Sequence, residues 1–232
     1  MTPYQLEIKL QSPTIAASGE GWGAVIDTDI VFDDLGLPFI PSKRIKGCLK
    51  DAAQDVVEML DLAKINFDMD WKLTYGLPGS QASAPVYFSN LTIENYDNTK
   101  QWLEYLMYMK NYENIISRET ILKTFTTLRW QTAINDDGVA EDHSLRTARV
   151  IKKGFTFLGD IWIDTETLDR LDNTTPSQNS EKVLNTLILS CFVCNHMGTS
   201  RTRGFGQISC RLKSTDGSYL PIPKNLEELC MK

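Results

Sequence analysis

The chain has 232 residues, of which 42% are hydrophobic and 23% are charged, an ordinary composition for a soluble globular protein. No apolar run approaches the ~18 residues of a membrane span, and the N-terminus MTPYQLEIKL lacks the basic start and apolar core of a signal peptide. The five cysteines are an odd number without a framework spacing, so we expect a reducing, cytoplasmic location without membrane partners.

The net charge of −6 argues against nucleic-acid binding unless the basic residues gather in one place. Along the chain they form three groups: Lys43, Arg44, Lys46 and Lys50; Arg146, Arg149, Lys152 and Lys153; and Arg201, Arg203, Arg211 and Lys213. A basic track on an otherwise acidic body would hold one strand by its phosphates. The alternative is an ordinary solvated surface on which the groups form no track.

The first quarter of the chain predicts two strands and a helix. Residues 4–11 alternate apolar and polar side chains, as a half-buried strand does. Residues 24–32 predict a second strand, which two aspartates interrupt. After a proline-containing turn, Ser42 is the expected N-cap of a helix whose apolar face continues through Leu60.

The rest of the chain mixes strands and helices. The elements expected there are, in order, a strand at 85–93, a helix at 99–110, a basic run at 144–153, a strand at 155–163, a polar linker at 172–179, a helix at 181–197 that Gly198 ends, and a strand at 207–212. This order favours an α+β fold with an antiparallel sheet.

The segment Gly198 to Gly206, with the sequence GTSRTRGFG, combines three glycines with two arginines. Glycines let backbone amides approach a bulky anion, and guanidinium groups match the geometry of phosphate. The alternative is a helix end and tight turn that use glycine for structural reasons alone. Two arginines in such a turn favour phosphate binding.

Three segments in a fixed order resemble one known family. The first joins GAVIDTD at 23–29 to GLPFIPSKRIKG at 36–47, the second extends from Gln131 to Val150, and the third is the glycine-rich segment 198–206. Together they resemble the RAMP superfamily of CRISPR-associated proteins. The first is similar to the family's strand and entry into its first helix, the second to its protruding thumb hairpin, and the third to its C-terminal glycine-rich signature.

The resemblance implies a ferredoxin-like (RRM-like) antiparallel sheet with helices, inserted segments and a protruding β-hairpin. On this basis residues 1–232 form a single RAMP domain, with an inserted or lid segment at about 61–120 and a thumb-like hairpin at about 129–153. It further implies an RNA-binding subunit of a type III CRISPR effector complex, with guide RNA (crRNA), target RNA and other effector subunits as partners. Two branches remain open: the repeated backbone subunit, and a type III-D relative that caps one end of the guide without cleaving.

The expected RNA contacts are backbone contacts that do not depend on sequence. The residues expected to make them are Lys43, Arg44, Lys46, Lys50, Arg146, Arg149, Arg201, Arg203, Gly204 and Phe205. The lysines lie at a helix start, where amides and the helix dipole favour a phosphate. Phe205 either packs in the fold or stacks on a base.

Asp27 is the candidate catalytic residue, because it matches the aspartate with which backbone subunits of the family cleave target RNA. Such a carboxylate orients a 2′-hydroxyl for attack on the neighbouring phosphate, or helps to hold a divalent cation such as Mg²⁺ or Mn²⁺, with no tightly bound cofactor expected otherwise. An aspartate at this place also serves as an ordinary turn residue. Both interpretations remain open.

Cys191, Cys194 and His196 suggest a different class of function, a zinc- or thiol-dependent module. They lie in an apolar helical stretch, however, where cysteine behaves as a small hydrophobic residue. We therefore expect no metal site there. Since no histidine precedes His143, the sequence also argues against processing of the guide RNA by an N-terminal histidine.

Overall fold

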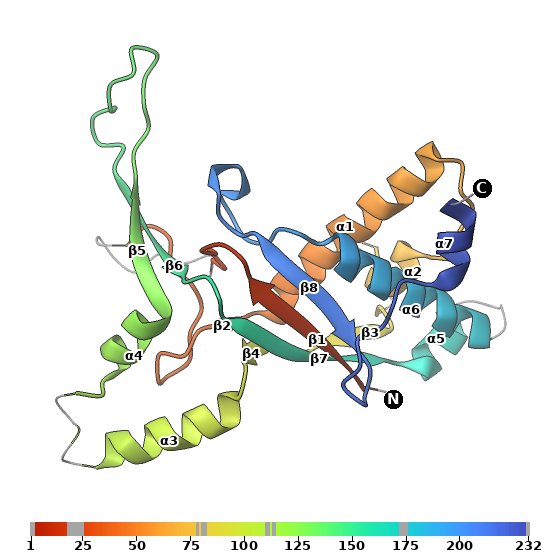
Figure 1. Cartoon of the computed structure of the whole chain (residues 1–232), viewed down its shortest axis with the longest axis horizontal. Helices are drawn as coiled ribbons and strands as arrows, with labels where there is room; N and C mark the ends of the chain where they lie inside the picture. Colours follow the sequence, from red (N-terminus) through yellow and green to blue (C-terminus); the bar gives the residue numbers. More distant parts are fainter. Residues whose placement is uncertain are drawn as a thin grey trace.

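A computed structural model describes residues 3–17, 26–77, 79, 83–109, 112, 115–171 and 176–230 (Figure 1). The main sheet comprises β1 (Pro3–Leu10), β2 (Phe39–Ile40), β3 (Val86–Phe88), β4 (Leu91–Ile93), β7 (Thr156–Ile163) and β8 (Ile208–Lys213). Its strand order is β2-β4-β7-β1-β8, with β3 also paired to β7. Every pairing in it is antiparallel.

The core of the fold consists of two β-α-β units, which together form one antiparallel sheet. In sequence the core elements are β1, α1 (Ser42–Leu62), β4, β7, α6 (Pro176–Val193) and β8, and the four strands lie in the order β4-β7-β1-β8. That is the order of a ferredoxin-like sheet, with the first and third strands at the centre. The predicted α+β fold class is therefore confirmed.

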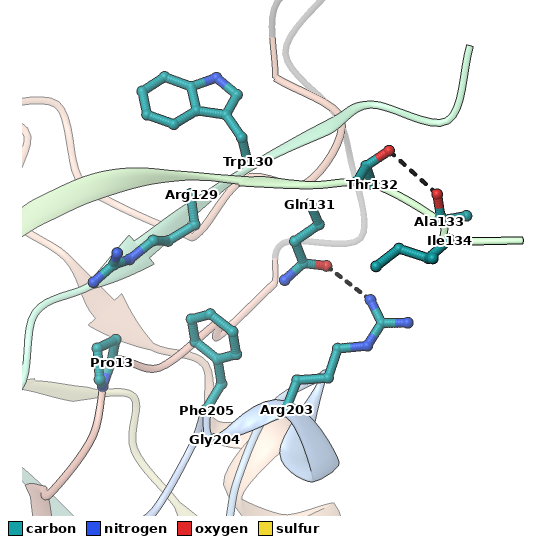
Figure 2. Close-up of a pocket in the computed structure, with 10 residues that line it drawn as sticks. All are labelled: Pro13, Arg129, Trp130, Gln131, Thr132, Ala133, Ile134, Arg203, Gly204 and Phe205. Atoms are coloured by element: carbon teal, nitrogen blue, oxygen red, sulfur yellow. Dashed lines mark hydrogen bonds between the residues drawn. The ribbon is translucent and has the colours of Figure 1, made fainter. Parts of the chain in front are cut away.

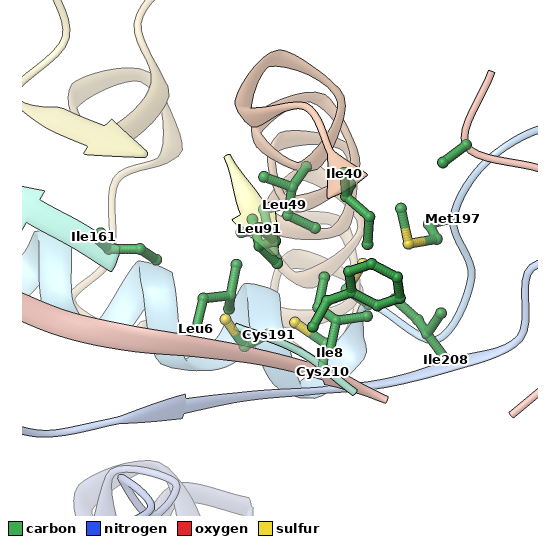
Figure 3. Packing of buried hydrophobic residues seen from close by; sticks show 14 of the residues in the cluster. Leu6, Ile8, Ile40, Leu49, Leu91, Ile161, Cys191, Met197, Ile208 and Cys210 are labelled. Atoms are coloured by element: carbon green, nitrogen blue, oxygen red, sulfur yellow. The ribbon is translucent and has the colours of Figure 1, made fainter. Parts of the chain in front are cut away.

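The sheet and the two long helices enclose one apolar core (Figure 3). In β1 the side chains of Leu6 and Ile8 are fully buried, as the alternation of the sequence predicts. On α1 the buried residues Ile45 and Leu49 are four apart and meet the sheet on one helix face. α6 packs against α1 and β8, and its Cys191 joins the core.

The other elements surround this core. They are α2 (Trp71–Tyr75), α3 (Tyr96–Tyr108), α4 (Arg118–Phe125), α5 (Thr165–Leu171), the 3-10 turn η2 (Arg201–Arg203), α7 (Lys224–Cys230), and a two-stranded sheet of β5 (Thr126–Gln131) and β6 (Arg146–Ile151). The β5–β6 hairpin projects from the body, on the side away from α5 and α7 (Figure 1). Among the described helices, none has the length and apolar character required to span a bilayer.

Several predicted boundaries were wrong. The strand expected at 85–93 is two strands, because Ser89 between them bonds to Asp160 of β7 through its amide and its hydroxyl. α1 has Pro41 as its N-cap in place of Ser42, whose amide instead donates to the Asn90 side chain at 2.9 Å.

Two further expectations concern segments that lie only partly in the described residues. Of the strand expected at 24–32, residues 24 and 25 lie outside them, and residues 26–32 form only isolated bridges. Of the linker expected at 172–179, residues 172–175 lie outside them, and the rest is the start of α6, since Pro176 is well suited to a first helical turn. α6 ends at Val193, so Gly198 does not cap it.

Candidate nucleic-acid interface

The base of the β5–β6 hairpin faces the glycine-rich loop 198–206 across two adjoining grooves. The first groove, of about 850 Å³, is lined by Pro13, Arg129, Trp130, Gln131, Thr132, Ala133, Ile134, Arg203, Gly204 and Phe205. Figure 2 shows Arg129 and Gln131 reaching from β5 toward the loop, while the Trp130 ring lies on the opposite side of the strand. The first groove therefore has cationic groups on both of its walls.

The second groove, of about 760 Å³, adjoins the first and shares Gln131 and Arg203 with it. Its other walls include Thr28, Arg146, and the loop residues Thr199 and Ser200. Residues from three distant parts of the sequence thus meet here. Each part belongs to one of the three family-like segments identified in the sequence.

Arg203 and Phe205 are the loop residues that meet the hairpin. The Arg203 guanidinium donates from Nη1 to the Gln131 side-chain oxygen at 3.2 Å and is otherwise exposed (Figure 2). Phe205 packs on a small apolar cluster at the hairpin base that includes Ile15 and Val150. Of the two expectations for Phe205, packing is therefore realised, with one part of the ring left to line the first groove.

Backbone geometry fixes the shape of the loop. Gly206 has φ +77°, and a β-carbon there would lie 2.0 Å from the Met197 carbonyl oxygen. Gly198 has φ +83°, with the corresponding distance to the Ile15 oxygen being 2.3 Å. Gly204 has φ +81° but open space around it. Gly198 and Gly206 are therefore required for close backbone contact, whereas Gly204 leaves open space beside Arg203.

Asp27 is exposed and is next to Thr28 and hydrogen-bonded to Thr147, which both line the second groove. Its Oδ2 accepts a hydrogen bond from the Thr147 amide at 2.6 Å, and its own amide donates to the Thr147 carbonyl oxygen at 2.9 Å. These two bonds attach the segment that contains Asp27 to β6 beside Arg146. The structure thus places the candidate catalytic carboxylate next to the hairpin base.

Asp29 and Arg149 have a structural role. Asp29 is 1% exposed, and its Oδ1 lies 3.6 Å from Nε of Arg149, whose side chain is 17% exposed. The Arg149 guanidinium also lies over the Phe32 ring, 5.7 Å from the ring centre. This buried ion pair holds the Asp27 segment against β6, so Arg149 is less available to a phosphate than the sequence suggested.

The basic residues of α1 do not line either groove. Lys43 and Arg44 are exposed, but Lys50 is directed into the fold, where its Nζ donates to the Gly76 carbonyl oxygen at 3.0 Å and lies over the Trp71 ring. Burial lowers the pKa of Lys46, and the neighbouring charge of Lys50 lowers it further. Of the four residues, Lys43 and Arg44 are therefore exposed, whereas Lys46 and Lys50 are half-buried.

Arg201 lies on the opposite side of the loop from Arg203, in a separate hollow between the loop and α1. That hollow is also lined by Cys48, Asp51 and Asp55. The Arg201 Nε donates to the Gly198 carbonyl oxygen at 3.1 Å, which stabilises the 3-10 turn. The two loop arginines therefore face different surroundings, and only Arg203 lines the grooves.

The cysteine cluster is part of the core. Cys191 and Cys194 are 2% and 4% exposed, whereas His196 is exposed. Hydrogen bonds with Cys191 and Cys194, together with full burial, raise the pKa of Cys210 well above its usual range. Across the described part of the chain, no group of three His, Cys, Asp or Glu side chains is arranged to hold a metal ion.

Arg129, Trp130 and Gln131 line the first groove but were not among the residues expected to contact RNA. A signal was available, because Arg129 and Gln131 alternate with Trp130 along a strand that begins at Thr126. That alternation places the two polar side chains on one face. Which face meets the loop depends on how the hairpin packs, and no local pattern encodes this.

Comparisons with known proteins agree with this architecture. The family model of the RAMP superfamily matches residues 7–209. The chain therefore belongs to the RAMP superfamily, as the sequence motifs predicted. No match was found among curated proteins.

Two solved structures resemble the chain over most of its length. A chain in the cryo-EM structure of the type III-B Cmr-beta complex bound to cognate target RNA has a TM-score of 0.61 and 12% identity, with 91% of this chain and 97% of that chain covered. A chain in the apo state of Cmr-beta has a TM-score of 0.58 and 12% identity, with the same coverage. At this identity the likeness concerns the fold.

Proposed function

We propose that this protein is an RNA-binding subunit of a type III CRISPR effector complex, which holds the backbone of a guide RNA in the two grooves beside the β5–β6 hairpin. The observation that carries the proposal is the meeting of Arg203, Arg146 and Thr28 around one groove. Membership of the RAMP superfamily and the fold shared with Cmr-beta chains support it. Other effector subunits and a target RNA are the implied partners.

The groove walls favour a single strand over a duplex. Arg129, Arg146 and Arg203 supply donors for phosphates in the grooves. Trp130, which is 66% exposed with its ring on the other side of β5 (Figure 2), offers a face for an unpaired base beside the grooves. Contacts of this kind do not depend on base identity. Specificity for a target would then come from base pairing with the guide, with the protein holding the backbone.

The binding proposal is tested with Arg146→Ala combined with Arg203→Ala, measured as binding of a short uridine-rich RNA over a range of salt concentrations. We expect about tenfold weaker binding and a salt slope that falls by about 0.7 for each arginine removed. The matched control is Arg170→Ala, an exposed arginine on α5 that lies 4.0 Å from Glu166 and does not line either groove. Unchanged affinity in the double variant would remove the grooves from the RNA site.

We further propose that Asp27 takes part in cleavage of target RNA. The exposed carboxylate beside the second groove would orient the 2′-hydroxyl of a bound nucleotide toward the adjacent phosphate. The 2′-oxygen would bond to phosphorus and give a 2′,3′-cyclic phosphate as the bond to the 5′-oxygen breaks, with the 2′-hydroxyl proton passing to water and the 5′-oxygen taking a proton from water. The buried ion pair of Asp29 with Arg149 keeps Asp29 from acting as a second carboxylate there. A Mg²⁺ or Mn²⁺ ion at Asp27 would therefore take its remaining ligands from RNA phosphates and water.

Asp27→Asn tests this role, because the asparagine oxygen still accepts the hydrogen bond from Thr147. In the assembled complex we expect target cleavage to fall by roughly a hundredfold or more, with guide binding unchanged. If cleavage continues at the same rate, Asp27 has no catalytic role, and a subunit that caps one end of the guide becomes the better assignment. Addition of a chelator separately tests the divalent ion.

A further inference from the structure

Helix α3 rests on the core along one side only. None of its described residues is fully buried, and Tyr96, Leu103 and Met107 are the half-buried residues by which it packs. The Tyr96 hydroxyl donates to Oδ2 of Asp33 at 2.8 Å, which fixes the start of the helix. The other side of α3 faces solvent, well away from the hairpin tip (Figure 1).

The solvent side of α3 carries three aromatic residues. Trp102, Tyr105 and Tyr108 are 66%, 51% and 87% exposed. Tyr105 is two residues after Leu103, which places it about 200° around the helix and so directly away from the core. The rings of Trp102 and Tyr105 meet edge to face, with their centres 6.2 Å apart. We call these three residues the aromatic stripe.

The surroundings of the aromatic stripe are acidic. Asp97 and Glu104 are exposed, and Glu104 is four residues before Tyr108, so the two side chains are neighbours on the helix. Lys100 is held over the Tyr96 ring, 5.8 Å from its centre. Burial and the Asp33 hydrogen bond raise the pKa of Tyr96 to about 12, and the charges of Asp97 and Glu104 contribute to the shift.

We propose that the aromatic stripe is a docking surface for an arginine-bearing segment of a partner protein. A guanidinium group stacks on an indole or phenol ring and at the same time pairs with a carboxylate, and Tyr108 beside Glu104 offers both. Lysine lacks the flat group needed for stacking. RNA is disfavoured, because its phosphates would approach Asp97 and Glu104.

The area of the aromatic stripe sets the strength of this contact. Three rings exposed to this degree offer roughly 400 Å², against about 800 Å² per partner in a stable interface. The stripe alone therefore binds weakly. It fits a partner that is already held nearby by other contacts, as neighbouring subunits of an assembly are.

The test uses a labelled peptide with three arginines spaced by alanines, and a matched peptide with lysines, measured by fluorescence anisotropy. We expect the wild-type protein to bind the arginine peptide at least fivefold more tightly than the lysine peptide. Replacement of all three aromatic residues by alanine should abolish this preference. Equal binding of both peptides by the wild-type protein, or an unchanged preference in the alanine variant, overturns the proposal.

A second variant keeps the test valid if the alanine variant does not fold. Asp97→Asn with Glu104→Gln leaves the rings in place and should weaken binding of the arginine peptide several-fold; unchanged binding counts against the proposal. Binding of uridine-rich RNA should be the same in both variants and the wild type. Loss of RNA binding in the alanine variant would assign the aromatic stripe to nucleic acid and overturn the proposal of a protein partner. If instead the groove proposal fails, peptide binding by the stripe should remain intact.

Discussion

At the scale of single residues, the glycines of the 198–206 loop show how one sequence pattern serves two purposes. Gly206 and Gly198 lie against carbonyl oxygens of neighbouring segments, so they are required by the fold itself. Gly204 has a similar φ of +81°, but a β-carbon there would meet only open space, and it lies beside Arg203 at the first groove. The sequence alone does not distinguish the three, because they share residue type and local context.

Alanine substitution separates these roles. Gly204→Ala should reduce the free energy of unfolding by about 1–2 kcal/mol, the cost of a left-handed conformation for a residue with a side chain. Gly206→Ala should reduce it by at least about 2 kcal/mol more, because the β-carbon would overlap the Met197 carbonyl oxygen. Urea unfolding of the two variants measures the difference. Equal losses would show that the loop moves to accommodate the new side chain.

Arg149 and Lys50 show that residue type alone does not predict which basic side chains are available to RNA. Both are basic residues in basic stretches of the sequence, and both were expected to contact RNA. In the fold, Arg149 pairs with the buried Asp29, and Lys50 donates to the Gly76 carbonyl oxygen. Asp29 is 120 residues from Arg149 in sequence, and Gly76 is 26 residues from Lys50. No local sequence pattern therefore predicts either contact.

At the scale of elements, the β5–β6 hairpin is divided by charge. Its base carries Arg129 and Arg146, whereas its tip carries exposed Asp136 and Asp137. Glu141 and Asp142 lie between the two, on the wall of the second groove. The base is also attached to α4, because the Lys152 ammonium group donates to the carbonyl oxygens of Lys123 and Thr124, both at 2.8 Å. Phosphates are therefore expected at the base, and the acidic tip is expected to remain free of the strand.

A shortened hairpin tests this division. Residues 134–140 are replaced by Asn-Gly, a two-residue turn that suits antiparallel strands. The affinity for a uridine-rich RNA should stay within about twofold, since the phosphate contacts at the base remain. Filter binding over a range of salt concentrations measures it. A loss of more than about fivefold would place the tip in the RNA site.

The elements themselves were partly predictable from the sequence. Alternation indicated β1, and helical spacing indicated α1, because both periods persist over many residues; a strand was also expected at 155–163, where β7 lies. The break at Ser89 and the start of α6 at Pro176 were missed. The break depends on two hydrogen bonds between Ser89 and Asp160, which lies on a strand distant in sequence. The helix start lies in a polar stretch without apolar spacing.

At the scale of the whole molecule, the location of the charged residues is more informative about nucleic-acid binding than the net charge is. The chain carries a formal charge of −6, yet Arg129, Arg146 and Arg203 gather around two adjoining grooves. Acidic residues are also present, because Glu141 and Asp142 line the second groove, and others lie on the hairpin tip and on α3. The family motifs indicated segments that line the grooves, but the meeting of these segments in space depends on the fold. Only part of the expected basic track forms, since the lysines of α1 lie outside the grooves.

The most direct test of RNA binding in the grooves is photo-cross-linking with an RNA that contains 4-thiouridine, followed by identification of the linked peptides. We predict that the linked residues fall in β5 and the adjoining chain at 129–134 and in the loop at 198–206. Cross-links confined to α3, or to the open face of the sheet around Arg211, would contradict the account.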